Sequence, residues 1–392
     1  MYNLTPAFAV MMLGLLLAAG PLLWVMLRQR GTAGVGRFHA VAVLTLFLTF
    51  DLVMFGAFTR LTDSGLGCPD WPGCYGQSNP LSAHSAIDAA QAHMPDGPVT
   101  HGKAWIEMVH RYLATGVGVL ILALTAMAWW ARWFAGRRSN DSKRAVNPWL
   151  PTFVLLWVCV QGAFGALTVT MKLFPAIVSL HLLGGYTLLA LLALQVVRSA
   201  PLADPNNRAA ALSRGLWLGL LGALGLLFAQ AASGAWVSTN YAVLACTDFP
   251  LCQGQWWPPM DASGFALWRP LGMGANGQAI SFQAITAIHF FHRSLAMLTA
   301  AVLLAVAWRF SRPACPAHLH RPARLLGILV ALQLLTGLSN VILGWPLVAA
   351  VLHTGGAGAM VATLVWMLAA SRLVPTASVW DVANSTQPGY AK

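Results

Sequence analysis

The chain contains a single glutamate, Glu107, and its setting in the stretch WIEMVHRYLA is chemically unusual. Glu107 lies near the start of a long apolar segment, three residues before His110. A carboxylate is costly to place in a membrane helix, and residues three apart on a helix share one face. The stretch therefore predicts a functional site in which a carboxylate lies beside a histidine.

Four histidines fall inside apolar segments, and they form two pairs at corresponding positions of a repeated sequence. His110 and His181 make the first pair, and His292 and His353 make the second. Each lies about six to eight residues from the outer end of its expected helix, or roughly 10 Å below that end. Two imidazoles at equal depth on facing helices can ligate a heme iron from both sides. We therefore predict one bis-histidine heme site in each half of the chain.

The duplication favours metal ligands over structural histidines. A lone histidine in a membrane helix more often hydrogen bonds to another helix, but four in a repeated pattern reverse that preference. A zinc or copper site is the rival, and it needs a third ligand that the two copies do not share. Some glycines would leave space for a flat macrocycle, although close helix packing explains them equally well: Gly184, Gly185, Gly355, Gly356 and Gly358. The loop histidines are interpreted as solvated: His84, His93, His101, His318 and His320.

An internal repeat must position these residues. Four segments of the first half match four segments of the second half in the same order: 56–76 with 234–254, 106–114 with 288–296, 161–169 with 333–341, and 180–185 with 352–357. Each copy holds four expected spans, so both copies have the same orientation. The repeat predicts two parallel four-helix bundles, at 38–197 and 215–371, related by an axis along the membrane normal.

The composition is that of a polytopic helical membrane protein. Of 392 residues, 58% are hydrophobic and 9% are charged, and apolar runs of about twenty residues recur along the chain. Nine spans are expected, and they are 6–27, 38–60, 104–130, 150–171, 175–197, 215–236, 284–308, 323–345 and 347–371. The first is an extra N-terminal helix, within 1–30, and its leader MYNLTPAF lacks the positive charge of a cleaved signal peptide.

Basic residues define the orientation in the lipid bilayer. The net charge is +12, and 17 of the 23 lysines and arginines fall on one side of the expected topology. That side is therefore cytoplasmic, with the N-terminus periplasmic and the C-terminus cytoplasmic. It includes a linker at 198–214 and a tail at 372–392. The charge thus reports topology and contact with anionic lipid, and it does not indicate nucleic-acid binding.

The two halves differ at the residue beside the first histidine. Position 107 is glutamate, and the corresponding position 289 is histidine. A carboxylate beside only one heme suggests proton transfer during chemistry at that heme. The structural alternative is that Glu107 pairs with Arg111 or hydrogen bonds an imidazole N–H.

Four cysteines fall in two expected outer loops, where disulfides are permitted: Cys68, Cys74, Cys246 and Cys252. The segments CPDWPGC and CTDFPLC space each pair equally, and their turn-forming residues predict that each pair closes a small loop. A redox role for the first pair stays open. Cys159, in a helix, and Cys315, in a cytoplasmic loop, are interpreted as reduced thiols.

Together, these motifs resemble the heme A synthase family over about residues 38 to 371. The resemblance rests on FGAFTRLTDSGLGCPDWPGC, on EMVHR with its paired HFFHR, on the two later histidines and on the duplicated cysteine loops. It implies an enzyme of the bacterial inner membrane that oxidises a methyl group of heme O to a formyl group. The product, heme A, serves terminal cytochrome oxidases.

The resemblance also implies a role for each site residue. His110 and His181 would face the iron of heme O, His292 and His353 would hold a heme b cofactor, and Glu107 would be the catalytic carboxylate. It implies disulfides Cys68–Cys74 and Cys246–Cys252. Contacts with a heme O synthase and with cytochrome oxidase assembly factors would follow, and a homo-oligomer is compatible. The electron partner is not identified by the sequence.

Two other functional classes fit parts of the pattern. A diheme b-type cytochrome that oxidises quinol would hold stable low-spin heme b in both halves and make no modified heme. A heme transporter would use the parallel repeats for alternating access and would need polar residues through the full membrane thickness. The expected helices are polar mainly near their outer ends, which argues against transport.

Overall fold

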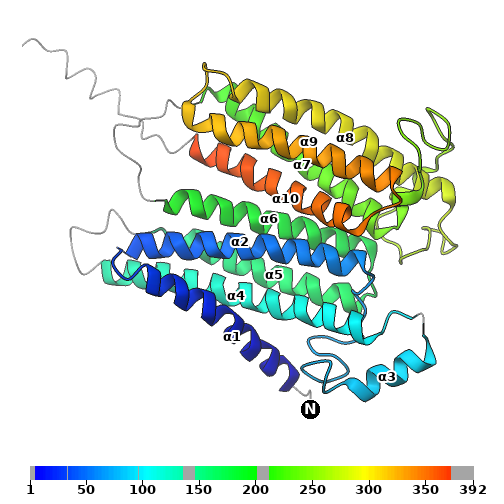
Figure 1. Cartoon of the computed structure of the whole chain (residues 1–392), viewed down its shortest axis with the longest axis horizontal. Coiled ribbons are helices and arrows are strands. Elements are labelled where there is room, and N and C mark those ends of the chain that lie inside the picture. The colour runs from blue at the N-terminus through cyan, green and yellow to red at the C-terminus, as the bar shows by residue number, and fades with distance from the viewer. Residues whose placement is uncertain (1–4, 33, 96, 136–145, 201–211, 372–392) are drawn as a thin grey trace, which may run out of the picture.

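The computed structural model describes residues 5–32, 34–95, 97–135, 146–200 and 212–371, and within these ranges it is all-helical without β-strands (Figure 1). Nine helices of the described chain are long and apolar enough to cross a membrane, as predicted. They are α1 Thr5–Arg28, α2 Gly34–Leu61, α4 His101–Ala135, α5 Trp149–Thr170, α6 Pro175–Ser199, α7 Arg214–Thr239, α8 Phe282–Phe310, α9 His320–Ile342 and α10 Leu347–Ala370. The expected tail, and most of the expected linker, lie outside the described residues.

The sequence did not predict the short elements outside the spans. They are α3 His84–His93 and three short 3₁₀ helices, Ala242–Leu244, Ala262–Phe265 and Ala317–Leu319. The α3 helix belongs to the loop between α2 and α4, and it lies at the end of the molecule where α4 begins (Figure 1). Its ten residues are too few to give a clear apolar period in the sequence.

The long helices form two groups of four. In the first unit, α2 contacts α4 and α6, and α5 contacts the same two helices, which closes a ring. In the second unit, α7, α8, α9 and α10 close the same ring in the same order. The units meet where α10 packs on α2 and α6 and where α6 packs on α7 (Figure 1). This arrangement is consistent with two repeated four-helix bundles.

Residues at the boundary between the units contact their own counterparts in the repeat. Arg60 Nη2 donates a hydrogen bond to the carbonyl oxygen of Ser238 at 2.6 Å, and these residues are 178 positions apart. The Tyr241 hydroxyl donates to Asp63 Oδ1 at 2.6 Å, again across 178 positions. Corresponding residues meet in this way only near a twofold axis. The contacts therefore support a parallel repeat with its axis between the units.

Local signals explain how several spans begin. Pro175 opens α6, where its fixed φ suits the first turn and its missing N–H costs nothing. Ser213 caps α7 by accepting a hydrogen bond from the Leu216 N–H, and Ser281 caps α8 in the same way. Within lipid these helices gain little from the hydrophobic effect, so close packing between them stabilises the bundles.

The extra helix α1 packs along α4, the helix that carries Glu107 and His110. The helices approach closely because Gly14 faces Thr115, and a Cβ at Gly14 would collide with the threonine side chain. The N-terminal part of α1 also reaches the first cysteine loop, where Val10 shares an apolar cluster with both cysteines. The extra helix therefore supports the loop over the first unit.

Candidate active site

The structure brings the four membrane histidines together in the two pairs that the sequence predicted. His110 on α4 and His181 on α6 lie close enough to interact electrostatically, and so do His292 on α8 and His353 on α10. All four histidines are partly buried inside their own unit. Each unit therefore presents two imidazoles from helices on different sides of one bundle.

Each imidazole packs against a glycine of a neighbouring helix. The separations from an added Cβ to the nearest ring atom are 3.0 Å for Gly56 with His110, 3.4 Å for Gly165 with His181, 2.9 Å for Gly234 with His292 and 3.1 Å for Gly337 with His353. A larger residue would crowd the ring at Gly56, Gly234 or Gly337, while at Gly165 the added Cβ would only touch it. The four glycines occupy equivalent positions in the two units, and together they make a cradle for every histidine.

The sequence analysis missed this set of glycines and singled out others. A side chain at Gly184 or Gly356 would collide with the amide of Gln161 or Gln333, and Gly355 lies against Met54. Close helix packing therefore explains these glycines, as the alternative interpretation stated. The repeat alignment could have identified the correct positions, because glycine recurs at all four of them.

The ring nitrogens have different partners in the two units. In the second unit, His292 Nδ1 lies 2.8 Å from Ser233 Oγ, and His353 Nδ1 lies 3.0 Å from Thr336 Oγ1. In the first unit, His181 Nδ1 is buried without a hydrogen-bond partner in the described chain. The ring of His110 stacks on Phe55 with an interplanar angle of 10°.

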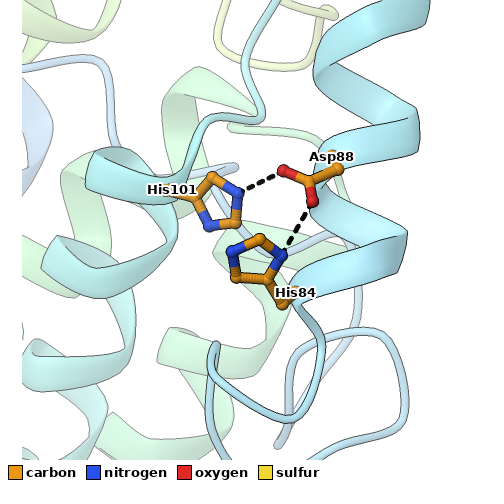
Figure 2. Close-up of side chains that lie close together, drawn as sticks. All are labelled: His84, Asp88 and His101. Atoms are coloured by element: carbon orange, nitrogen blue, oxygen red, sulfur yellow. Dashed lines mark hydrogen bonds and ion pairs between the residues drawn. The ribbon is translucent and has the colours of Figure 1, made fainter.

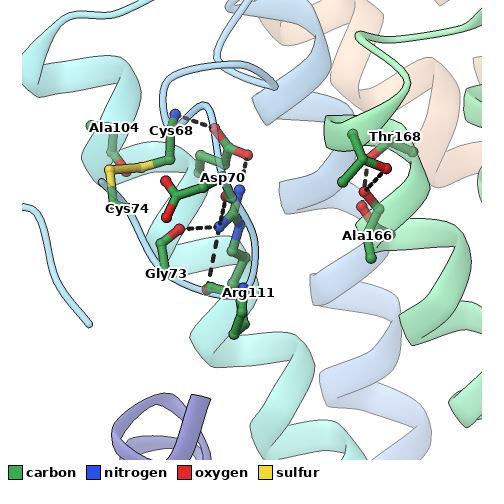
Figure 3. Close-up of polar contacts among 12 residues, drawn as sticks. Cys68, Asp70, Gly73, Cys74, Ala104, Arg111, Ala166 and Thr168 are labelled. Atoms are coloured by element: carbon green, nitrogen blue, oxygen red, sulfur yellow. Dashed lines mark hydrogen bonds and ion pairs between the residues drawn. A yellow bond between two sulfur atoms is a disulfide. The ribbon is translucent and has the colours of Figure 1, made fainter. Parts of the chain in front are cut away.

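Glu107 is 4% exposed, and both of its carboxylate oxygens contact the first cysteine loop or its support. Oε1 forms an ion pair with Arg111, and Oε2 accepts a hydrogen bond from the Cys68 N–H at 2.7 Å. Arg111 also donates to the carbonyl oxygens of Asp70 and Gly73 (Figure 3). The pairing with Arg111 is thus present, and Glu107 anchors the loop that covers the first unit.

The second unit repeats this anchor without a carboxylate. His289 Nδ1 accepts a hydrogen bond from the Cys246 N–H at 3.2 Å, and Arg293 donates to the carbonyl oxygen of Leu251 at 3.0 Å. Position 107 and position 289 therefore share the structural role of holding a cysteine loop. The second unit therefore holds its loop without a negative charge at the equivalent position.

The cysteine pairs are bonded, Cys68 to Cys74 and Cys246 to Cys252, while Cys159 and Cys315 are free thiols. In the second loop, Asp248 accepts hydrogen bonds from the Gly254 and Gln253 N–H groups, and these donors hold the pKa of Asp248 below its usual range. Each disulfide therefore closes a short, internally hydrogen-bonded loop over its unit.

The loop histidines predicted to be solvated are so only in part. Asp88 on α3 bonds to His84 Nδ1 and to His101 Nε2, each at 2.7 Å (Figure 2). The hydrogen bond from His101 is the main cause that lowers the pKa of Asp88. The cluster connects α3 to the start of α4 and so holds α3 against that end of the bundle. Asp88 and His84 remain exposed.

One acidic residue within a span escaped the sequence analysis. Asp51 lies on α2 and lines a cavity of about 380 Å³ together with Met54, Phe55, Phe58 and Val351 of α10. The cavity opens at the boundary between the units, beside the helix that cradles His110. An ionisable residue inside a membrane span is a functional candidate, and its position within an apolar run was visible in the sequence.

The donor set of each unit fits an axially ligated heme. Two imidazoles come from helices of the same bundle, and the glycines leave room for the rings to turn toward a bound iron. Nδ1 of His181 is buried without a hydrogen-bond partner among the described residues, so no protein group holds this ring in a fixed orientation and it can turn toward a bound group.

Comparisons with known proteins agree with this geometry. Residues 39–365 match the cytochrome oxidase assembly protein family. A heme A synthase of Shewanella oneidensis is 38% identical over 82% of this chain and 93% of its own length. Heme A synthases of Halalkalibacterium halodurans and Caulobacter vibrioides are each 28% identical, over 77% and 86% of this chain and over 86% and 93% of their own lengths. The chain therefore belongs to the family of cytochrome oxidase assembly proteins that contains the heme A synthases.

Proposed function

We propose that this membrane protein is a heme A synthase, which oxidises a methyl group of heme O to the formyl group of heme A. The observation that carries the proposal is a duplicated pair of cradled histidines with a carboxylate beside only one pair. The relatives named above supply the reaction class. The asymmetry between the units then supports one reacting heme and one resident heme.

The first unit is the substrate site in this proposal. His110 and His181 hold heme O, and Glu107 accepts or relays protons at the reacting methyl. Two successive two-electron oxidations, each adding a hydroxyl group from water and releasing two protons, turn the methyl group into a gem-diol, which loses water to give the aldehyde. The four electrons leave to an electron acceptor. The cysteine loop held by Glu107 and Arg111 excludes water from the outer side of the site.

The second unit is the cofactor site. His292 and His353 hold heme b, which supplies one-electron redox chemistry beside the substrate when it is bound. The hydroxyl groups next to these rings orient them, and His289 holds the second loop closed without adding a negative charge. The protein acts in the inner membrane on heme O delivered by a heme O synthase.

The test of the activity is heme analysis of membranes that contain this protein together with a heme O synthase. Extracted hemes are separated chromatographically, and heme A is expected only when both proteins are present. Membranes that accumulate heme O without heme A, while the purified protein carries heme b in both units, would favour a diheme electron-transfer cytochrome.

Histidine variants test the assignment of the two sites. We expect His292→Ala and His353→Ala to lose the tightly bound heme b, because each leaves the iron one axial ligand short. We expect His110→Ala and His181→Ala to keep that heme and stop heme A formation. Equal loss of heme b from all four purified variants would contradict the assignment.

A further inference from the structure

The residue before each cradling glycine differs between the two units. In the second unit these residues are Ser233 and Thr336, whose hydroxyl groups contact the imidazoles. Their counterparts in the repeat, 178 and 172 positions earlier, are Phe55 and Phe164. Two hydroxyl groups in one unit are therefore replaced by two phenyl rings in the other.

The Ser233 hydroxyl fixes which nitrogen of His292 carries the proton. Ser233 Oγ donates its only hydrogen to the carbonyl oxygen of Gln230 at 2.8 Å. With that hydrogen on the carbonyl oxygen, the hydroxyl acts as an acceptor toward Nδ1, 2.8 Å away, and this arrangement favours a hydrogen on Nδ1. Gln230 Nε2 lies 3.0 Å from the same nitrogen but also donates to the carbonyl oxygen of His292 at 3.3 Å, so this amide does not set the tautomer. The Nε2 lone pair of His292 is left free for a metal.

Thr336 repeats the arrangement at the other ligand. Its Oγ1 donates to the carbonyl oxygen of Leu332 at 2.9 Å and lies 3.0 Å from His353 Nδ1. The same argument places the proton of His353 on Nδ1. Both imidazoles of the second unit are thus held in the tautomer that ligates iron through Nε2.

The rings of the first unit lack this restraint. Phe55 and Phe164 have no acceptor atom, and His181 Nδ1 has no partner among the described residues. The rings also face their glycines differently. In the second unit, both rings turn Cε1 toward their glycine, with Nδ1 the next nearest atom. In the first unit, His110 turns Nε2 toward its glycine, and His181 turns Cε1, with Nε2 the next nearest atom. Phe55 stacks on the His110 ring but offers it no acceptor, so in this unit no hydroxyl group beside either ring sets the tautomer before a heme binds.

We propose that Ser233 and Thr336 are positioning residues that make the second unit a permanent heme site, and that Phe55 and Phe164 make the first unit exchangeable. The inference rests on the proposed function, in which the first unit must admit heme O and release heme A. Loss of such an outer partner of a ligating histidine typically lowers metal affinity about 10–100-fold. Tight heme binding suits a cofactor that stays in its site, and weaker heme binding suits a substrate that must leave as product.

The test is the rate at which purified, heme-loaded protein gives its heme to excess apomyoglobin, followed by absorbance. We expect the double variant Ser233→Ala, Thr336→Val to release the resident heme about 10–100-fold faster than the unaltered protein. Thr336→Ser keeps the acceptor and should release heme at the original rate. Ser339→Ala is the matched control on the same helix, because its hydroxyl donates only to a backbone carbonyl, at 2.8 Å.

A reciprocal variant and a spectrum separate positioning from general loosening. Phe55→Ser with Phe164→Thr should raise the heme that remains per purified chain, because it gives the first unit its missing acceptors. Electron paramagnetic resonance of the oxidised resident heme should change in the Ser233→Ala, Thr336→Val protein and not in Ser339→Ala, since the signal depends on the orientation of the axial rings.

The outcomes separate this proposal from the proposed function. Release at the original rate by a folded Ser233→Ala, Thr336→Val protein would overturn the positioning role, whatever the activity. Fast release by that variant supports the role even if the unaltered protein makes no heme A, a result that would refute only the proposed activity.

Discussion

Replacing Glu107 with glutamine separates the charge of this residue from its structural role. The glutamine side chain has the same length and keeps an oxygen that can accept the hydrogen bond from the Cys68 N–H. It removes the negative charge that pairs with Arg111. Arg111 retains the carbonyl oxygens of Asp70 and Gly73 as acceptors, so its own charge is not left without partners.

The structure sets the expected size of the effects of this variant on stability and on turnover. A hydrogen bond between charged groups contributes about 1.5–3 kcal/mol to stability. The ion pair with Arg111 is the contact that the variant loses, and the hydrogen bond from the Cys68 N–H is kept. We therefore expect the variant to fold and to keep its heme b. Loss of a general base lowers turnover by roughly 10²-fold or more, which corresponds to about 2.7 kcal/mol of activation free energy. The partly oxidised alcohol should accumulate.

The assay is chromatographic separation of hemes from membranes that carry the variant and a heme O synthase, with the resident heme measured by absorbance. Glu107→His provides a sharper variant, because the second unit already uses histidine to hold its cysteine loop. It should fold and fail to make heme A. His289→Gln is the matched control at the equivalent position, and its heme A formation should stay within a few-fold of the unaltered level.

Near-normal heme A from Glu107→Gln or Glu107→His would refute the reasoning. Glu107 would then serve only to hold the Cys68–Cys74 loop, and the catalytic proton acceptor would have to lie elsewhere. An equal loss of activity in His289→Gln would also count against it, because that variant alters loop anchoring without touching the carboxylate.

Gly234→Ala places a Cβ 2.9 Å from His292 and should lower the heme retained per chain. Gly225→Ala on the same helix meets open space and should leave the heme content unchanged. The heme absorbance per amount of purified protein measures both. A reporter fused to the C-terminus should be active in the cytoplasm, and activity in the periplasm would contradict the topology. Asp88→Asn should speed amide exchange in α3, because it removes the carboxylate shared by two histidines. The unaltered protein should lose protection of the α3 amides in the same way below about pH 4. The pKa of Asp88 is lowered, so its contribution to stability is complete above the usual value and is lost as pH falls through the folded value. Protection factors, which correct for the intrinsic pH dependence of exchange, that do not fall with pH would refute this.

The sequence by itself determined the number of spans and their places in the chain to within a few residues, and it predicted the pairing of the four histidines. Each transmembrane helix requires about twenty apolar residues in one continuous segment, so its signal is local and strong. The repeat added long-range information, because it related His110 to His292 and one cysteine loop to the other. It also revealed the difference between Glu107 and His289, which is the most informative feature for function.

Only the tertiary structure decided what these residues contact. Glu107 bonds to Cys68, which lies 39 residues away, and Ser233 reaches His292 across 59 residues. Such contacts depend on how helix faces turn toward one another, and that rotation is set by the packing of all neighbouring side chains at once. The α3 helix escaped prediction because it is short and is placed by a polar cluster with α4. Hydropathy therefore gives the spans, and helix packing decides which atoms of the site meet.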